Sequence, residues 1–169
     1  MVRQVYAGRK FTIEKRVYRT NGGEHEYDVI VHPGAAVILP ILDDGRIVLV
    51  ANVRPAAGDT LLELPAGTID PPETPRACAA RELTEETGYR ASLLTPLMAF
   101  YASPGICTEK MHVFVARGLT AGERELDAGE QIETRVMEYD DVLTAVFEGR
   151  IVDGNTIAAL LYFDRFARA

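Results

Sequence analysis

Glu82, Glu85 and Glu86 are the residues of this sequence whose types and spacing could do chemistry. Residues three and four apart are neighbours on an α-helix, so a helix here would gather the three carboxylates on one face. On a solvated face such like charges cost only about 0.2–0.5 kcal/mol per pair and need no function. In a cleft with an effective dielectric near ~20, two carboxylates ~6 Å apart would repel by about 3 kcal/mol, and a divalent cation such as Mg²⁺ would relieve that repulsion. The spacing leaves two interpretations open, a solvated acidic face and a cation site shared with substrate phosphates.

The residues that flank the glutamates predict that this segment is helical. Pro75 suits the first position of a helix, Thr74 before it can cap the N-terminus, and Gly88 can end the last turn. Most residues between them are good helix formers. Small side chains lie roughly opposite the glutamates and should let the helix pack closely on a sheet: Ala77, Ala80 and Thr84.

The longer segment Gly67 to Tyr89 resembles the Nudix box, the loop–helix–loop signature of hydrolases that cut nucleoside diphosphates linked to another group. Every fixed position of that signature is filled: Gly67, Glu73, Arg81, Glu82, Leu83, Glu85, Glu86, Gly88 and Tyr89. The resemblance implies a pyrophosphohydrolase that uses two or more Mg²⁺ ions, with Mn²⁺ as an alternative. Four residues would be the metal ligands, the first through its main-chain carbonyl: Ala66, Glu82, Glu85 and Glu86. It further implies that Arg81 orients the carboxylates, that Glu73 supports the loop, and that Gly67 and Gly88 are structural.

The resemblance also implies the fold, an α/β protein with a Nudix-type α/β/α sandwich, a mixed central sheet and a small N-terminal β segment. We expect residues 1–33 to form an N-terminal β arm and residues 34–169 to form the Nudix domain. In the ADP-ribose-hydrolysing branch of this family a similar N-terminal segment crosses to a partner subunit. The resemblance therefore implies a homodimer.

Further residues are similar to the ADP-ribose pyrophosphatase subgroup. Ser103-Pro104-Gly105 begins 14 residues after Tyr89 and resembles the proline marker of that subgroup, although an ordinary turn between strands would look the same. Arg54, followed by Pro55, could bind phosphate or form a surface ion pair. Glu63 and Glu109 could accept hydrogen bonds from adenine or ribose, or could be solvated residues at strand edges.

The general base is the least determined part of the predicted site. In the subgroup a glutamate in the loop before the last long strand often serves as base or as an extra metal ligand, and Glu130 matches it best. Some relatives carry a second acidic residue where this chain has Ala128, so Glu85 or Glu86 is an alternative base. The resemblance predicts cleavage of ADP-ribose to AMP and ribose 5-phosphate. The alternatives are another substrate (a GDP-sugar, FAD, NADH or an oxidised nucleotide) and a non-catalytic nucleotide sensor.

Composition excludes several other classes. A formal charge of −7 over 169 residues argues against a nucleic-acid backbone as partner. The longest apolar run, Ala35 to Leu42, contains Pro40 and is too short to span a bilayer. Charges throughout Met1 to Thr20 leave no apolar core for a signal peptide, so we expect a cytoplasmic protein. Cys78 and Cys107 form no metal-binding pattern and are expected to be free thiols, with a disulfide between them as the alternative.

The remaining elements are predicted from hydrophobic patterning and turn residues. Two continuous apolar runs, Ala35–Ile41 and Ile47–Val53, meet at Asp43-Asp44-Gly45 and should be strands buried on both faces. The chain should begin with a hairpin that turns at Asn21-Gly22-Gly23, where Asn-Gly tolerates positive φ. The other expected elements are a segment leading into the box at Leu61–Pro65, strands at Ser92–Ala102, Met111–Ala116 and Ile132–Tyr139, a loop at Thr120–Gly129, and helices at Asp141–Glu148 and Thr156–Ala167, the last capped by Asp153 or Asn155.

Overall fold

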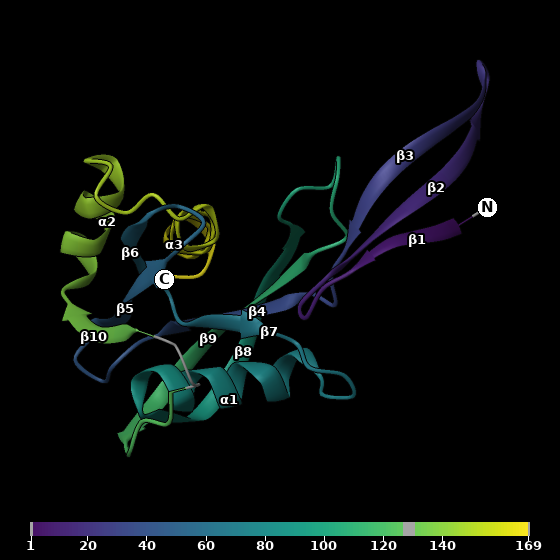
Figure 1. Cartoon of the computed structure of the whole chain (residues 1–169). Helices are drawn as coiled ribbons and strands as arrows, with labels where there is room; N and C mark the ends of the chain where they lie inside the picture. Colours follow the sequence, from purple (N-terminus) through teal and green to yellow (C-terminus); the bar gives the residue numbers. More distant parts are fainter. Residues whose placement is uncertain (1, 127–130, 169) are drawn as a thin grey trace.

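A computed structural model describes residues 2–126 and 131–168 of the chain. Its described elements form three sheets and three helices (Figure 1). In chain order they are β1 (Val2–Ala7), β2 (Thr12–Thr20), β3 (Gly23–Val31), β4 (Ala35–Pro40), β5 (Ile47–Arg54), β6 (Asp59–Glu63), β7 (Ala66–Thr68), α1 (Pro75–Thr87), β8 (Tyr89–Tyr101), β9 (Lys110–Ala121), β10 (Ile132–Met137), α2 (Tyr139–Phe147) and α3 (Gly154–Phe166).

The N-terminal segment forms its own antiparallel sheet in the order β1-β2-β3, and Figure 1 shows this sheet projecting from the rest of the molecule. The predicted hairpin is confirmed, because Thr20 pairs with Gly23 across the turn. The prediction that the Asn-Gly step takes the positive φ of this turn is wrong. Gly23, with φ of 113°, is the residue of the turn that takes positive φ, and Asn21 does not.

The body of the molecule is a sandwich around a mixed four-stranded sheet in the order β7-β4-β9-β8. β4 and β9 are parallel, whereas β7 and β8 pair with them antiparallel. Alternate β4 residues face opposite layers, with Ala36 and Ile38 packed against α1 and Val37 and Leu39 packed in the core that includes α2 and α3. The predicted α/β/α arrangement with a mixed central sheet is confirmed.

The two apolar strands predicted from the sequence do not pair with each other. β5 belongs to a second sheet, in the order β10-β5-β6, and only a single bridge between Ile41 and Ile47 joins it to the end of β4. The turn at Asp43-Asp44-Gly45, where Gly45 has φ of 89°, redirects the chain from one sheet to the other. Burial of both strands on both faces is confirmed along most of their length.

Helix α1 has the predicted ends but packs through a different face. The Thr74 side chain accepts a hydrogen bond from the Ala77 N–H, and Gly88 ends the helix with φ of 76°. Ala77 and Ala80 are exposed, so the expected contact of these small residues with the sheet is wrong. The buried stripe contains Cys78, Ala79, Leu83 and the two glutamates beside them, Glu82 and Glu86, because these positions share one arc of the helix.

Several element bounds also differ from those expected. β9 continues to Ala121 instead of ending at Ala116, and β10 ends at Met137 because Tyr139 already begins α2. Asp153, not Asn155, caps α3 by accepting a hydrogen bond from the Thr156 N–H.

Both cysteines are free thiols, as predicted. In the described part of the chain no helix is long and apolar enough to cross a membrane.

Candidate active site

A cleft of about 590 Å³ lies where the N-terminal sheet, the central sheet, the β5–β6 sheet and two helices meet. Its wall includes Ala66 and Gly67 from β7, and Glu82 and Glu86 from α1. These two carboxylates are almost fully buried, with Glu82 exposing 8% of its surface and Glu86 exposing 2%. Of the two interpretations of the glutamate spacing, the solvated acidic face is therefore wrong for Glu82 and Glu86.

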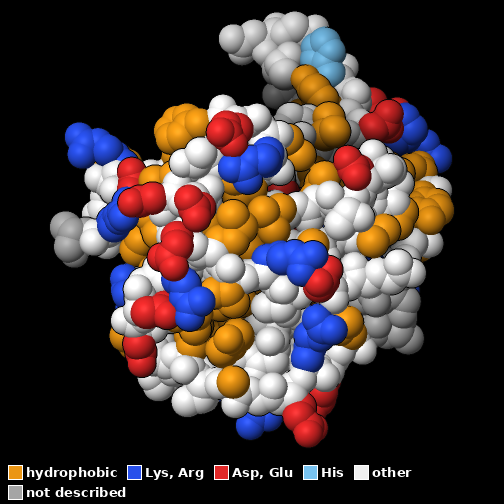
Figure 2. Space-filling view, turned by 90° about the vertical axis from the view of Figure 1, so that its left-hand side faces the viewer, with side chains coloured by type: hydrophobic (Ala, Val, Ile, Leu, Met, Phe, Trp, Pro, Cys, Tyr) orange, Lys and Arg blue, Asp and Glu red, His pale blue; other side chains and the backbone are white. Residues whose placement is uncertain are grey.

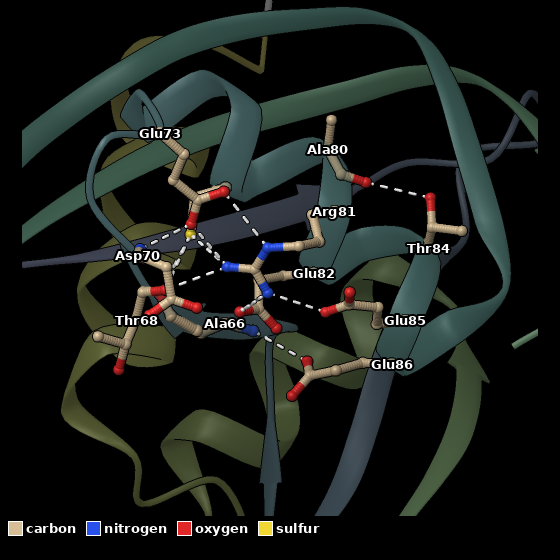
Figure 3. A network of polar contacts seen from close by, with 12 residues as sticks. Ala66, Thr68, Asp70, Glu73, Ala80, Arg81, Glu82, Thr84, Glu85 and Glu86 are labelled. Atoms are coloured by element: carbon tan, nitrogen blue, oxygen red, sulfur yellow. Dashed lines mark hydrogen bonds and ion pairs between the residues drawn. The ribbon is translucent and has the colours of Figure 1, made fainter. Parts of the chain in front are cut away.

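The short strand β7 holds both buried carboxylates in place (Figure 3). Glu86 Oε2 accepts a hydrogen bond of 3.0 Å from the Ala66 N–H. The Glu82 carboxylate occupies the space beside Gly67, because a Cβ on Gly67 would lie only 1.8 Å from Glu82 Oε1. Gly67 is thus required by the position of a neighbouring carboxylate and not by its own backbone dihedral angle.

Arg81 joins the box carboxylates into one network, shown in Figure 3. Its guanidinium donates to Glu73 at 2.7 Å, to Glu82 at 2.7 Å and to Glu85 at 2.8 Å. It also donates to the Thr68 carbonyl oxygen at 3.1 Å, which ties the helix to the end of β7. The hydrogen bond to Glu73 raises the pKa of Arg81 above its ordinary value, and the same bond lowers the pKa of the Glu73 carboxyl. The arrangement fixes the loop between β7 and α1 relative to the helix.

Replacing Arg81 by Gln should cost about 2–3 kcal/mol of stability, because several partly buried carboxylates lose their shared cation. For a chain of this size that loss lowers the melting temperature by about 4–12 °C. Thermal unfolding measures it, with Arg19→Gln as the matched control, since Arg19 pairs with Glu24 at a fully solvated site and should matter little. Equal melting temperatures for the two variants would contradict the role given to Arg81.

The loss of stability caused by Arg81→Gln should depend on pH in a predictable direction. The pKa of Glu73 is lower in the folded protein than in the unfolded chain, so its ion pair stabilises the fold above the unfolded pKa and loses that effect as pH falls through the folded value. The difference in melting temperature between the parent and Arg81→Gln should therefore narrow as the pH is lowered from about 4.3. A difference that widens in acid would exclude this linkage.

Glu85 lies differently from the other two glutamates. Its carboxylate is directed at Arg81, and Glu85 is not among the residues that line the cleft. Across residues 2–126 and 131–168, no three His, Cys, Asp or Glu side chains stand together in a geometry ready to enclose a metal. The donor chemistry at the cleft nevertheless fits a hard cation, because Glu82 and Glu86 supply buried carboxylate oxygens beside the Ala66–Gly67 main chain.

Arg54 forms an ion pair with Glu63 and also lines the cleft, so the predicted ion pair is confirmed and phosphate binding stays a prediction. Its Nε lies 3.0 Å from each oxygen of Glu63, and its Nη2 lies 2.6 Å from Oε2. Glu63 is buried, whereas the Arg54 side chain is 44% exposed and lies at the wall of the cleft. The hydrogen bonds to Glu63 raise the pKa of Arg54. Glu63 therefore aims the guanidinium and is not a solvated edge residue.

Glu109 also lines the cleft and directly precedes β9, which begins at Lys110. Its Oε1 is 3.4 Å from His32 Nδ1, which in turn accepts a hydrogen bond from the Gly34 N–H at 3.1 Å. His112 is not among the cleft residues and pairs with Ala36 inside the central sheet, where burial lowers its pKa. Glu130 lies outside the described residues, so its position relative to the cleft stays a prediction.

Other cleft residues were not identified as site residues from the sequence. Asn52 comes from β5, Asp70 from the loop after β7, and Asp153 from the cap of α3. Arg9 and Lys10 come from the turn between β1 and β2. None of these positions belongs to a spaced motif, and only the folded topology brings them together. Asp153 could be predicted from the sequence as the N-cap of α3, but nothing in the sequence around it predicts that it lines a cleft.

Comparison with known proteins agrees with this fold. The profile of the NUDIX domain family matches residues 31–160. The chain belongs to the Nudix family. It is 37% identical to "ADP-ribose pyrophosphatase" of Bacillus subtilis (strain 168), over 94% of this chain and 88% of that protein. It is 34% identical to "Methanol dehydrogenase activator" of Bacillus methanolicus, with the same shares covered. A solved structure titled "Crystal structure of ADP compounds hydrolase" superposes with a TM-score of 0.86 at 26% identity, covering 99% of this chain and 92% of that one.

Proposed function

We propose that this protein is a Mg²⁺-dependent pyrophosphohydrolase that cleaves the diphosphate of ADP-ribose into AMP and ribose 5-phosphate. The observation that carries this proposal is the pair of buried carboxylates, Glu82 and Glu86, facing a cleft of about 590 Å³. Arg81 neutralises Glu82 only in part, and a bound divalent cation would offset the repulsion that remains between two buried negative groups and an anionic substrate. The 37% identity with an ADP-ribose pyrophosphatase over nearly the whole chain favours ADP-ribose among the candidate substrates.

The residues of the cleft have separate proposed roles in binding the cation and the diphosphate. Glu82 and Glu86, with the Ala66 main chain, would hold the cation. Glu85, the remaining ligand predicted from the sequence, would have to turn from Arg81 toward the cleft to join them. A bound divalent cation neutralises phosphate charge and lowers the pKa of a coordinated water. Arg81 keeps Glu82 oriented through its 2.7 Å ion pair. Arg54, fixed by Glu63, presents its guanidinium to the cleft as a phosphate donor.

The proposed general base is Glu130, with Glu85 or Glu86 as the alternative. A base must lie within hydrogen-bond reach of the attacking water, directly or through one further water. Glu130→Gln should lower kcat by about 10²–10⁴-fold if it removes that proton. Glu125→Gln, in the same loop, is the control and should leave kcat unchanged. If both variants keep the parent's kcat, a box glutamate takes the role.

Substrate choice is tested by a panel of compounds with product identification. ADP-ribose, GDP-mannose, FAD, NADH and an oxidised nucleoside triphosphate are each incubated with the protein and Mg²⁺, with and without a chelator. We expect the highest kcat/KM for ADP-ribose, AMP and ribose 5-phosphate as products, and no turnover after chelation. If ADP-ribose ranks among the poorest substrates, another member of the panel replaces it. Failure to hydrolyse any of them would favour the non-catalytic sensor.

The assembly is proposed to be a homodimer in which residues 1–33 form an exchanged arm and residues 34–169 form the Nudix domain. The separate, projecting β1-β2-β3 sheet supports this proposal, because its strands leave apolar side chains such as Val2 and Tyr18 exposed. Figure 2 shows that on the face viewed from the α2 side acidic and basic side chains are interspersed and form no basic stripe of the kind that binds nucleic acid. Light scattering during gel filtration tests the dimer, and a mass of 18.6 kDa would refute it.

A further inference from the structure

The cleft contains a buried amide that has no role in the site described so far. Asn52 exposes only 7% of its surface, yet it lines the cleft together with Arg54. Its side chain makes no hydrogen bond to another residue within the described parts of the chain. Across those same residues no side-chain polar atom is both sealed from solvent and unpaired, so the Asn52 amide must open onto the cleft. Buried polar groups are normally hydrogen-bonded, so a group bound in the cleft is the expected partner of this amide.

The backbone around Asn52 is firmly held. β5 is the central strand of the β10-β5-β6 sheet, and Asn52 pairs with Ile132 of β10 on one side and with Leu61 of β6 on the other. Side chains alternate along a strand, so Asn52 and Arg54 point to the same face, with Cα atoms about 7 Å apart. The amide therefore has a fixed starting point beside the guanidinium.

A carboxylate at the start of α3 lies in the same part of the cleft. The pKa of Arg54 is raised mainly by its hydrogen bonds to Glu63, and the charge of Asp153 adds to this effect, which places Asp153 near the β5 face. Asp153 Oδ2 accepts hydrogen bonds from Thr156, at 2.8 Å from its N–H and at 2.7 Å from its hydroxyl. Thr156 Oγ1 accepts in turn from the Leu64 N–H at 2.9 Å, which joins α3 to the end of β6 (Figure 1). Asp153 Oδ1 accepts no hydrogen bond from any residue that the structure describes and is available to a ligand.

These groups favour hydroxyls over other ligand chemistries. A hydroxyl can donate to the Asp153 carboxylate, and it can both donate to and accept from the Asn52 amide. A phosphate fits less well here, because the charge of Asp153 would repel it. A nucleobase usually stacks on an aromatic ring, and the described residues of the cleft wall include none. Leu61, which lies opposite Asn52 in the sheet and also lines the cleft, offers an apolar surface to the C–H groups of a sugar ring.

We propose that Asn52 and Asp153 bind hydroxyl groups of the sugar that the diphosphate links to the nucleoside, an inference that rests on the function proposed above. Arg54 presents its guanidinium to the diphosphate from a position two residues along β5. A sugar attached to the second phosphate would then reach the Asn52 amide. Asn52 thereby helps the cleft to distinguish a nucleoside diphosphate sugar from a plain nucleoside diphosphate.

Asn52→Leu tests this inference with two compounds that resist hydrolysis. The α,β-methylene analogue of ADP-ribose carries the sugar, and α,β-methylene ADP lacks it. Each is titrated calorimetrically into the parent and the variant in the presence of Mg²⁺. We expect the variant to bind the ADP-ribose analogue with a Kd about tenfold weaker, since leucine has a similar volume but makes no hydrogen bonds, and to bind α,β-methylene ADP within about twofold of the parent. Equal losses for both compounds, or no loss for either, would overturn the inference.

Stability and two further variants separate ligand binding from a structural role. An amide without a protein partner adds no hydrogen bond to the fold, so Asn52→Leu should keep or raise the melting temperature. A fall of more than about 5 °C, with weaker binding of both compounds, would show a structural role and overturn the inference. Asn52→Ala removes the amide without adding bulk and should show the same selective loss. Asn21→Leu changes an exposed residue of the β2–β3 turn that does not line the cleft, and it should bind both compounds like the parent.

The binding measurement keeps this result independent of the proposed reaction. A selective loss for the ADP-ribose analogue supports the sugar contact even if the parent fails to hydrolyse ADP-ribose. Hydrolysis of ADP-ribose by the parent, together with equal Kd values for the parent and Asn52→Leu, would keep the proposed function and overturn this inference. A parent that binds neither compound would contradict both.

Discussion

Glu86→Gln should abolish most of the turnover of ADP-ribose while leaving the protein folded. The glutamine keeps the shape of the side chain, and its amide oxygen can still accept the hydrogen bond from the Ala66 N–H, which is 3.0 Å long in the parent. The variant loses the negative charge with which a buried carboxylate binds a divalent cation. We expect kcat to fall at least about a hundredfold, as loss of metal affinity or position commonly does.

The stability of this variant distinguishes a chemical effect from a structural one. Removing one of two neighbouring buried charges relieves repulsion, so the melting temperature measured with a chelator should shift by no more than about 3 °C. Glu123→Gln is the matched control, because Glu123 is exposed and does not line the cleft, and it should behave like the parent. A Glu86→Gln protein that hydrolyses ADP-ribose at the parent's rate would remove Glu86 from the metal site.

Gly67→Ala is the second variant with a large expected effect, because the added methyl group needs the space that the Glu82 carboxylate occupies. The new Cβ would lie 1.8 Å from Glu82 Oε1 and 2.0 Å from its Cδ. The end of a flexible side chain can move where the backbone cannot, so the carboxylate should leave its position and the fold should survive. We expect kcat to fall about a hundredfold, with a change in melting temperature of about 3 °C or less.

Gly105→Ala provides the comparison, since nothing lies within 4 Å of a Cβ at Gly105, and this variant should keep full activity. A double-mutant cycle shows whether Gly67 acts through Glu82. If it does, Gly67→Ala adds little to the loss already caused by Glu82→Gln, because the carboxylate it displaces is absent. Additive losses would show that the methyl group acts on something other than Glu82.

The local parts of the site could be predicted from the sequence because their causes are local. Thr74, Pro75 and Gly88 set the ends of α1 by capping rules that need no tertiary contacts, and the structure confirms them. The spacing of Glu82 and Glu86 correctly placed both on one helical face. The spacing alone could not predict that this face is buried. The periodicity of a helix does not show which other elements pack against it.

The features of the fold and site that the sequence did not predict correctly depend on contacts between distant segments. Ala77 and Ala80 were expected on the sheet because small residues permit close packing, but Cys78, Ala79 and Leu83 bury more apolar surface there. The pairing of Arg54 with Glu63 depends on β5 and β6 being neighbours, and the position of Arg9 depends on where an entire sheet docks. Such relations follow from topology and leave no periodic signal in the chain.

The central claim is that the buried carboxylates of α1 bind the cation that acts on a diphosphate. A crystal structure with Mn²⁺ and an ADP-ribose analogue whose bridging oxygen is replaced by a methylene group tests it most directly. We predict an anomalous scattering peak at about 2.0–2.3 Å from carboxylate oxygens of Glu82 and Glu86, with the analogue's phosphates on its other side. Mn²⁺ bound elsewhere, with the analogue outside this cleft, would contradict the account.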